Sequence, residues 1–378
     1  MLTVGLDNHA ATSTVRVLDD GGRTIESRTL RGSPAMMVRH LHALKESSGQ
    51  PMQVCFEASC NYGWLHDQLA PFCSRVAVAH PGQLRLIFRG KRKSDRVDAE
   101  KLAKLLLLDE VPPVHVPSID VRSWRALIEH RGTIVDKRTR AKNGLRAVLR
   151  SQAVTLPEGK RTAWLWTKAG REWLKDLPLA MPSDAVRRDM LLEEVEHHDR
   201  QIDRVTEELD RLGKGHPGVT LLRTIPGIGP RTAEAFCAYV DDPARFRRIK
   251  CVGSYFGLVP SQDSSAGVNR LGRITRQGPG TVRKLLVEAA WRGISKSPSL
   301  RALFERITRG EADRRKRALI AVAHHLARVM LSMLRSGAAW QERMGRTQDP
   351  EMNDAEQTPA EKAKARFEER TAPPAAAA

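Results

Sequence analysis

The chain has 378 residues, of which 41% are apolar, and it carries 63 Lys and Arg against 44 Asp and Glu, a formal net charge of +19. This length and apolar content suffice for two or three domains with hydrophobic cores, which excludes a disordered basic tail. Such a charge indicates a polyanionic partner, either nucleic acid or an anionic membrane surface. The longest apolar stretches, at 102–108 and 319–334, are short or interrupted by polar residues, so we expect no membrane span.

The N-terminal sequence and the cysteines indicate the cellular compartment of the protein. The first residues lack the basic segment and apolar run of a secretory signal. The cysteines form an odd set without a Cys-x-x-Cys pair, which favours reduced thiols over disulfides or a zinc site. They are Cys55, Cys60, Cys73, Cys237 and Cys251. We therefore expect a cytoplasmic protein without zinc.

Strand and helix patterns alternate in the first hundred residues. Three strands joined by turn residues are predicted first, at Thr3–Leu6, Thr14–Leu18 and Thr24–Leu30. The elements predicted next are a helix at Pro34–Leu44, a strand at Gln53–Phe56, a helix at Trp64–Leu69, a strand at Arg75–Ala79 and a helix at Asp98–Leu108. An antiparallel meander followed by alternating helices and strands predicts a mixed α/β sheet.

The middle of the chain predicts two long helices. Prolines at 112, 113 and 117 mark a domain edge, and 121–153 is a helical stretch with nine Lys and Arg between 122 and 150. A second helix has apolar residues at heptad spacing: Leu191, Val195, Ile202, Val205, Leu209 and Leu212, with His198 in the remaining position. The heptad predicts either a helix pair with 121–153 or a subunit interface. His198 is a polar core position rather than a metal ligand.

The region from 218 to 334 is helical and basic, and the end of the chain is polar. Between Ser264 and Arg335 there are sixteen Lys and Arg against four Asp and Glu. The last segment is rich in Ala, Pro and Glu and has no periodic apolar residues, so we expect disorder there. The predicted regions are 1–115, 116–215, 216–340 and a disordered tail at 341–378.

Four carboxylates stand at the ends of predicted elements. Asp7 and Glu57 each end a buried strand, and Asp95 and Asp98 share one face at a helix start. Each has an ordinary explanation alone, since Asp98 could pair with Lys101 and Asp95 could cap the helix. Together they suit a pair of Mg²⁺ or Mn²⁺ ions about 4 Å apart, which can polarise a scissile phosphate.

Basic residues surround the second pair of acids. They are Arg85, Arg89, Lys91, Arg92, Lys93 and Arg96. Cations at such positions neutralise phosphates, so we expect nucleic acid to lie over the acids.

A glycine-rich turn precedes a helix at Thr224-Ile-Pro-Gly-Ile-Gly-Pro-Arg-Thr232. Gly227 and Gly229 with Pro230 at the first helical position expose backbone N–H groups that suit one DNA phosphate, with Arg231 beside them. The turn looks like the hairpin of helix-hairpin-helix modules. It could equally be a tight connection that needs glycine for its geometry.

Two serines lie in a loop flanked by glycines, Gly257-Leu-Val-Pro-Ser-Gln-Asp-Ser-Ser-Ala-Gly267. Arginines follow it at Arg270, Arg273, Arg276 and Arg283. A hydroxyl held beside guanidinium groups could attack a phosphate, although serine-rich loops are more often only turns.

These motifs, in this order, resemble those of the DEDD-type transposases of the insertion-sequence 110 family, which are related to the Piv/MooV DNA invertases. The resemblance runs from about Val4 to Leu334. It rests on Val4-Gly-Leu-Asp7 followed by His9, Phe56-Glu57-Ala58-Ser59, Lys93-Ser-Asp95-Arg-Val-Asp98-Ala99, Gly257-Leu-Val-Pro260 and the segment from Ser264 to Arg283.

The resemblance implies a fold and a chemistry for each region. The first is a RuvC-like α/β domain of the RNase H type whose acids Asp7, Glu57, Asp95 and Asp98 hold Mg²⁺ or Mn²⁺. The second is a helical coiled-coil assembly region, and the third a mainly α-helical transposase domain. In that domain Ser265 would attack a DNA phosphate, form a phosphoserine link and release a 3′ hydroxyl. Ser264 is the alternative, because the family serine directly precedes glycine whereas here Ala266 intervenes.

The resemblance also implies partners. These are donor and target DNA, a structured non-coding bridge RNA that pairs with both, and further copies of the chain in a homodimer or homotetramer. The acids and a serine from another domain or subunit would form one composite centre. The compartment implied is the bacterial cytoplasm, in association with the nucleoid.

Two other functions stay open. A metal nuclease resembling Holliday-junction resolvases would use the same acids with water as the nucleophile. A non-catalytic nucleic-acid-binding protein would use only the basic surface. Replacing the serines tests the first alternative, and replacing Asp7 or Asp98 tests the second.

Overall fold

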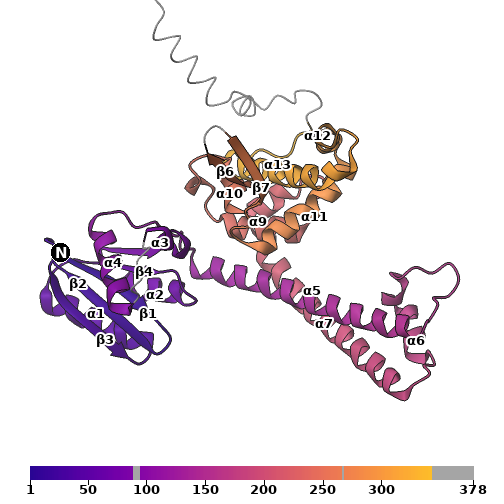
Figure 1. The fold of residues 1–378 in the computed structure, drawn as a ribbon, viewed down its shortest axis with the longest axis horizontal. Coiled ribbons are helices and arrows are strands. Elements are labelled where there is room, and N and C mark those ends of the chain that lie inside the picture. The colour runs from indigo at the N-terminus through magenta and orange to yellow at the C-terminus, as the bar shows by residue number, and fades with distance from the viewer. Residues whose placement is uncertain (88–93, 266–267, 343–378) are drawn as a thin grey trace, which may run out of the picture. The chain divides into compact units, whose positions relative to one another are not determined.

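A computed structural model describes residues 1–87, 94–265 and 268–342 (Figure 1). The chain divides into an N-terminal unit, Met1–Arg122, and a C-terminal unit that begins at Ser123. Of the predicted disordered tail, only residues 341 and 342 lie within the described part. The Glu342 carboxylate accepts hydrogen bonds from Ser297 Oγ and from the Ser299 N–H, each at 2.8 Å. Ordered contacts therefore reach Glu342.

The N-terminal unit is built on one five-stranded sheet. Its strands are β1 (Leu2–Asn8), β2 (Thr12–Leu18), β3 (Thr24–Arg31), β4 (Met52–Glu57) and β5 (Arg75–Ala79). They lie in the order β3-β2-β1-β4-β5. The first three are antiparallel neighbours, whereas β4 is parallel to both β1 and β5. This confirms the predicted meander and the mixed α/β sheet.

Helices cover both faces of this sheet (Figure 1). Helices α1 (Pro34–Ser48) and α2 (Tyr62–Leu69) pack against the face that carries the buried Val4 and Leu6 of β1. Helix α4 (Asp95–Leu107) and the buried Leu84 of α3 (Pro81–Ile87) pack with Cys55 on the opposite face. Strand alternation explains the split, because successive side chains point to opposite faces.

Gly5 sets how closely α4 approaches β1. A Cβ atom at this position would lie 1.9 Å from the Ala99 carbonyl oxygen and 2.6 Å from the Ala103 backbone nitrogen. Backbone atoms cannot rotate away, so Gly5→Ala must push the helix off the sheet. We expect a loss of about 1–3 kcal/mol in the free energy of unfolding, measured by urea denaturation.

A matched control for that variant is Gly21→Ala. Its added Cβ would meet only the side chain of Asp19, at 3.3 Å. We expect this control to stay within about 0.5 kcal/mol of the wild type. Equal stability of the two variants would contradict the tight packing of α4 on β1.

Two long helices pair in the C-terminal unit. Helices α5 (Ile119–Ser151) and α7 (Pro182–Lys214) run antiparallel, as three side-chain hydrogen bonds show. These join Arg131 to Thr206, Arg138 to Asp199 and Gln152 to Asp184. The connection between the helices contains a 3₁₀ turn, Trp164–Trp166, and α6 (Lys168–Asp176). The structure thus contains the helix pair, one of the two arrangements that the heptad predicts. The other arrangement, a subunit interface, stays a prediction.

Only one of the two sets of heptad positions on α7 is buried. Val195, Ile202 and Leu209, seven residues apart, are buried. The alternate positions are more open, since His198 and Val205 are half-buried and Leu212 is exposed. One helix partner covers one side of the apolar stripe, which explains the difference.

Helices form the core of the C-terminal unit. They are α8 (Pro217–Leu222), α9 (Pro230–Val240), α10 (Cys251–Tyr255), α11 (Gly280–Lys296), α12 (Pro298–Thr308) and α13 (Arg315–Ser336), with 3₁₀ turns at Pro243–Arg245 and Ala312–Arg314. Two strands, β6 (Pro260–Ser265) and β7 (Val268–Ile274), form an antiparallel hairpin. Within the predicted loop 257–267, residues Pro260–Ser265 form a strand. Its exposed polar residues give no alternation of burial from which a strand could be predicted.

One described segment, Ala312–Ser336, is long and apolar enough to cross a membrane by length and composition alone. Half of its 18-residue apolar window is buried inside the protein. Its side chains, among them Leu326 and Met330, belong to the core that also contains residues of α9 and α11. The segment is therefore accounted for as the central core helix of the C-terminal unit.

Candidate metal centre and nucleic-acid interface

The ends of β1 and β4 bring two predicted acids to one face of the sheet. These strands are parallel neighbours with Gly5 opposite Cys55. Asp7 and Glu57 lie two residues further along each strand and therefore share the face on which α4 packs. Asp7 is half-buried and Glu57 is exposed. The strand register thus places both acids at the same edge of the sheet.

Helix α4 brings the other two acids to the same face. Ser94 caps the helix, since its side chain accepts a hydrogen bond from the Val97 N–H. Asp95 is therefore not the capping residue, and both Asp95 and Asp98 lie in the first turn. Asp98 also lies 3.5 Å from Lys101 Nζ, so the ordinary explanation for this acid holds as well.

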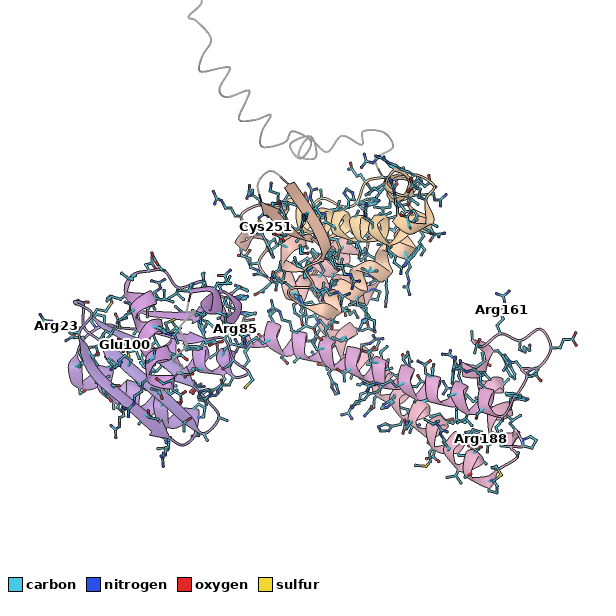
Figure 2. All side chains as sticks on the ribbon, in the orientation of Figure 1. Arg23, Arg85, Glu100, Arg161, Arg188 and Cys251 are labelled. Carbon is cyan, nitrogen blue, oxygen red and sulfur yellow. The ribbon has the colours of Figure 1, made fainter. Side chains whose placement is uncertain are left out.

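Contacts one turn along α4 fix its position over the sheet. Glu100 lies on α4 (Figure 2). Its carboxylate accepts a hydrogen bond of 2.6 Å from Arg16 Nη2 of β2 and lies 2.7 Å from Lys104 Nζ. These two cations lower the pKa of Glu100. Glu100 therefore has its charge compensated locally and anchors α4 rather than adding to the acid cluster.

A hydrogen-bond network ties together the loops that carry Asp7 and Glu57. Asn61 Oδ1 accepts from Ser59 Oγ at 2.9 Å and from Asn8 Nδ2 at 3.3 Å. Asn8 Oδ1 in turn accepts from Ser13 Oγ at 2.8 Å. The end of β1 is thereby joined to the loop after β4.

The pKa of Asp7 is shifted by its burial and by nearby charged residues. Burial raises the pKa of Asp7, His9 lowers it, and the negative charges of Asp95, Asp98 and Glu57 raise it further. Carboxyl oxygens of Asp7 and Asp95 and a ring nitrogen of His9 all lie within 4.8 Å of one another. The structure therefore brings Asp7 and Asp95 together with His9, for which no role was predicted. Asp98 and Glu57 act on the charge of Asp7 but are not part of this close group.

Most of the predicted basic residues beside the acids fall outside the described part of the chain. These are Arg89, Lys91, Arg92 and Lys93. Arg96 on α4 is described and exposed, and so is Arg85 on α3, which Figure 2 labels. Their contact with nucleic acid stays a prediction.

The glycine-rich turn connects α8 to α9 as predicted, with Gly229 at the N-cap and Pro230 at the first helical position. Gly227 has φ +95°, and a Cβ there would lie 2.5 Å from the Gly293 backbone nitrogen. This position needs glycine for packing, which was the simpler of the two explanations. A Cβ at Gly229 would meet nothing within 4 Å.

Arg231 is held inside the C-terminal unit. Its guanidinium contacts Asp210 and Glu234, the latter at 2.8 Å. Glu234 is buried, and its second carboxyl oxygen has no hydrogen-bond partner among the described residues. Binding of Arg231 to a DNA phosphate would therefore have to compete with two carboxylates.

Glu234 should give the C-terminal unit a pH-dependent stability. Burial raises its pKa to about 7, from an ordinary value of 4.5, against the effect of Arg231. The folded state thus binds a proton more tightly than the unfolded state, so stability is lost as pH rises from about 4.5 towards 7. The wild type should lose up to about 1.4 kcal/mol of its free energy of unfolding per pH unit in this window, and Glu234→Gln should not show this loss.

Urea denaturation at pH 5 and pH 7, followed by tryptophan fluorescence, measures that effect. Six of the seven tryptophans lie in the C-terminal unit and report its unfolding. Glu208→Gln, at a carboxylate that pairs with Arg211 on the surface of α7, is the control. It should leave the pH dependence much less changed, since solvent screens surface charges. Parallel pH profiles for Glu234→Gln and the wild type would contradict the prediction.

The hairpin β6–β7 carries the two serines. Ser264 Oγ accepts a hydrogen bond of 3.0 Å from Gln262 Nε2. The backbone of Ser265 pairs with Val268, and the Ser265 side chain lies outside the described part. The choice between Ser265 and Ser264 therefore stays a prediction.

The predicted arginines after the serines differ in their surroundings. Arg270, Arg273 and Arg276 are exposed. Arg283 is half-buried and donates hydrogen bonds to the carbonyl oxygens of Phe256 and Gln277, at 2.9 and 3.0 Å. Burial and the charge of Arg276 lower the pKa of Arg283. Arg283 therefore fastens the loop before α11, while the other three are open to a phosphate.

Comparisons with known proteins cover both units. A family model for DEDD transposases of the IS110 type matches residues 4–153, which include the four acids. A second, described as "Transposase IS116/IS110/IS902 family", matches residues 219–305, which include the glycine-rich turn and both serines.

Individual relatives agree with the family models. The chain is 28% identical to the transposase for insertion sequence element IS1111A of Coxiella burnetii, over 64% of this chain and 66% of the relative, slightly under two thirds of its length. It is 25% identical to a probable family 20 transposase of Pseudomonas aeruginosa, over 75% and 84% of the two chains. It is also 25% identical to the transposase for element IS1328 of Yersinia enterocolitica, over 64% and 70%. The chain belongs to the IS110 family of DEDD transposases.

Proposed function

We propose that this protein is an insertion-sequence transposase that cuts and rejoins DNA with a divalent-metal site in its N-terminal unit and a serine nucleophile in its C-terminal unit. The observation that carries the proposal is the gathering of Asp7, Glu57, Asp95 and Asp98 on one face of the sheet. Membership of the transposase family supplies the substrate class, DNA.

The acid cluster fits a divalent metal. Its donors are carboxylate oxygens, which Mg²⁺ and Mn²⁺ prefer. Burial raises the pKa of Asp7 and three neighbouring carboxylates raise it further, so the cluster holds negative charge that a cation would stabilise. Asp7, Glu57, Asp95 and Asp98 would hold Mg²⁺ or Mn²⁺, which would polarise the scissile phosphate and stabilise the leaving oxygen. The strand order β3-β2-β1-β4-β5 is consistent with a RuvC-like domain of the RNase H type.

The serine would do the covalent chemistry. Its Oγ loses a proton and forms a bond to phosphorus, while the bond from phosphorus to the 3′ oxygen breaks and that oxygen takes up a proton. The bond energy kept in the phosphoserine allows a 3′ hydroxyl of another strand to displace the serine and rejoin the DNA. Ser265 is the proposed nucleophile and Ser264 the alternative. Exposed Arg270, Arg273 and Arg276 would hold phosphates nearby.

The proposed partners follow from the family. Donor and target DNA would be paired with a bridge RNA, so that base pairing reads sequence while protein side chains hold phosphates. The more open half of the α7 heptad, which includes Val205 and Leu212, supports a homodimer or homotetramer built on a coiled coil. The proposed setting is the bacterial nucleoid.

A reconstituted reaction tests the proposal. The full chain is incubated with Mg²⁺, DNA bearing the ends of its element, a target plasmid and RNA transcribed from the non-coding segment beside its gene. Joined junctions are sequenced. Joining that requires RNA and metal supports the proposal, whereas cutting of four-way junctions without joining would favour a resolvase-like nuclease. Binding without any cutting would favour a non-catalytic protein.

A further inference from the structure

His9 lies directly beside the acid cluster. It follows the last residue of β1, and its backbone N–H donates a hydrogen bond of 2.8 Å to the Thr12 carbonyl in the turn to β2. The turn therefore fixes the backbone from which the imidazole extends. The ring is more than half exposed, and its Nε2 lies 3.4 Å from Asp7 Oδ1. A ring nitrogen also comes within 4.8 Å of a carboxylate oxygen of Asp95.

These distances suit ligands of a common ion. Two ligands in an octahedral shell, each about 2.1 Å from the ion, lie about 3.0 Å apart when adjacent and about 4.2 Å apart when opposite. The separation of 3.4 Å between His9 Nε2 and Asp7 Oδ1 is close to the value for adjacent ligands. The upper limit of 4.8 Å for the whole group exceeds the value for opposite ligands by an amount that rotation of the exposed Asp95 side chain can remove.

We propose that His9 supplies an imidazole nitrogen to the divalent ion held by Asp7 and Asp95. This inference rests on the metal site of the proposed function and adds a nitrogen to its carboxylate oxygens. Mg²⁺ strongly prefers oxygen ligands, whereas imidazole binds first-row transition ions. The site therefore discriminates in favour of Mn²⁺ over Mg²⁺, and His9 is the residue that sets the preference.

A simpler role for His9 is an ion pair with Asp7 that stabilises the turn. Both roles keep the ring near Asp7, so loss of activity in a His9 variant would not separate them. Direct coupling between the metal and a nitrogen nucleus does separate them, because only a ligand shows it.

The test uses the full chain without a polyhistidine tag, with Mn²⁺ as the probe. Binding is titrated from the electron paramagnetic resonance signal of free Mn²⁺, and the bound ion is examined by electron spin echo for ¹⁴N modulation. The variants are His9→Ala and Asp7→Asn. The matched control is His130→Ala, which removes another exposed histidine, on α5.

We expect ¹⁴N modulation in the wild type and in His130→Ala, and its loss in His9→Ala. The affinity of His9→Ala for Mn²⁺ should fall by about tenfold or more, with a smaller fall for Mg²⁺ measured by competition. Bound Mn²⁺ without ¹⁴N modulation in the wild type would overturn the role of His9 and leave the carboxylate site intact. Absence of Mn²⁺ binding, or equal binding by Asp7→Asn, would overturn the metal site itself and His9 with it.

Discussion

Asp7→Asn should abolish DNA cutting and joining while leaving the protein folded. Asp7 lies at the centre of the acid cluster, where it interacts with His9, Asp95, Asp98 and Glu57. An amide is a much weaker metal ligand than a carboxylate. Because a bound metal contributes several kcal/mol of transition-state stabilisation, we expect the rate of strand cleavage to fall about a thousandfold or more. Gel assays of cut DNA under single-turnover conditions measure this.

The same substitution should raise the Tm of the metal-free protein. The pKa of Asp7 is raised in the folded state, so folding disfavours its ionised form. Stability is therefore lost as pH rises above the ordinary value of 3.8 and through the raised pKa. The asparagine carries no charge and escapes this loss. Thermal unfolding in EDTA should show a higher Tm for the variant at pH 7 and nearly equal values for the two proteins at low pH.

Added metal should make the Tm of the wild type higher than that of Asp7→Asn. A ligand that binds only the folded state raises Tm, so Mg²⁺ or Mn²⁺ should stabilise the wild type and leave Asp7→Asn almost unchanged. Asp20→Asn serves as the control, since Asp20 is exposed and contacts the N-terminal amine. This control should cut DNA and respond to metal like the wild type. Cleavage at the normal rate by Asp7→Asn would exclude the acid cluster as the catalytic metal site.

The acid cluster could be predicted because strand alternation and helix spacing determine which residues share a face. The spacing of Asp95 and Asp98 puts them on one face of a helix, and Asp7 and Glu57 end adjacent parallel strands. Sequence periodicity says nothing about which face α4 covers. That depends on the contact of Gly5 with the backbone of α4.

The tertiary partners of individual arginines could not be predicted. The structure pairs Arg231 with Asp210 from α7 and with the buried Glu234, and Arg283 donates to carbonyl oxygens. The predicted contacts of both arginines with phosphates stay predictions. A cluster of arginines in sequence indicates positive charge, but burial and tertiary partners decide which of them remain open. His9 was missed because its position depends on the turn after β1.

Ser265→Ala should eliminate the covalent protein–DNA adduct. If Ser265 is the nucleophile, its Oγ forms the only bond between protein and DNA, and alanine has no atom to replace it. Removal of a catalytic nucleophile lowers the rate of the catalysed reaction by about 10⁴-fold or more, and we expect this for strand cleavage. The adduct is detected on denaturing gels with labelled DNA that is nicked beside the cleavage site, so that the released fragment diffuses away and rejoining is blocked.

Ser264→Ala is the matched control, because it removes the same hydroxyl from the adjacent strand position. Water can replace the hydrogen bond that the exposed Gln262 donates to Ser264, so we expect a rate within about tenfold of the wild type. The reverse result, with the adduct lost only in Ser264→Ala, would move the nucleophile to Ser264. Adduct-free cutting by both variants would mean that water attacks the phosphate, as in a resolvase-like nuclease.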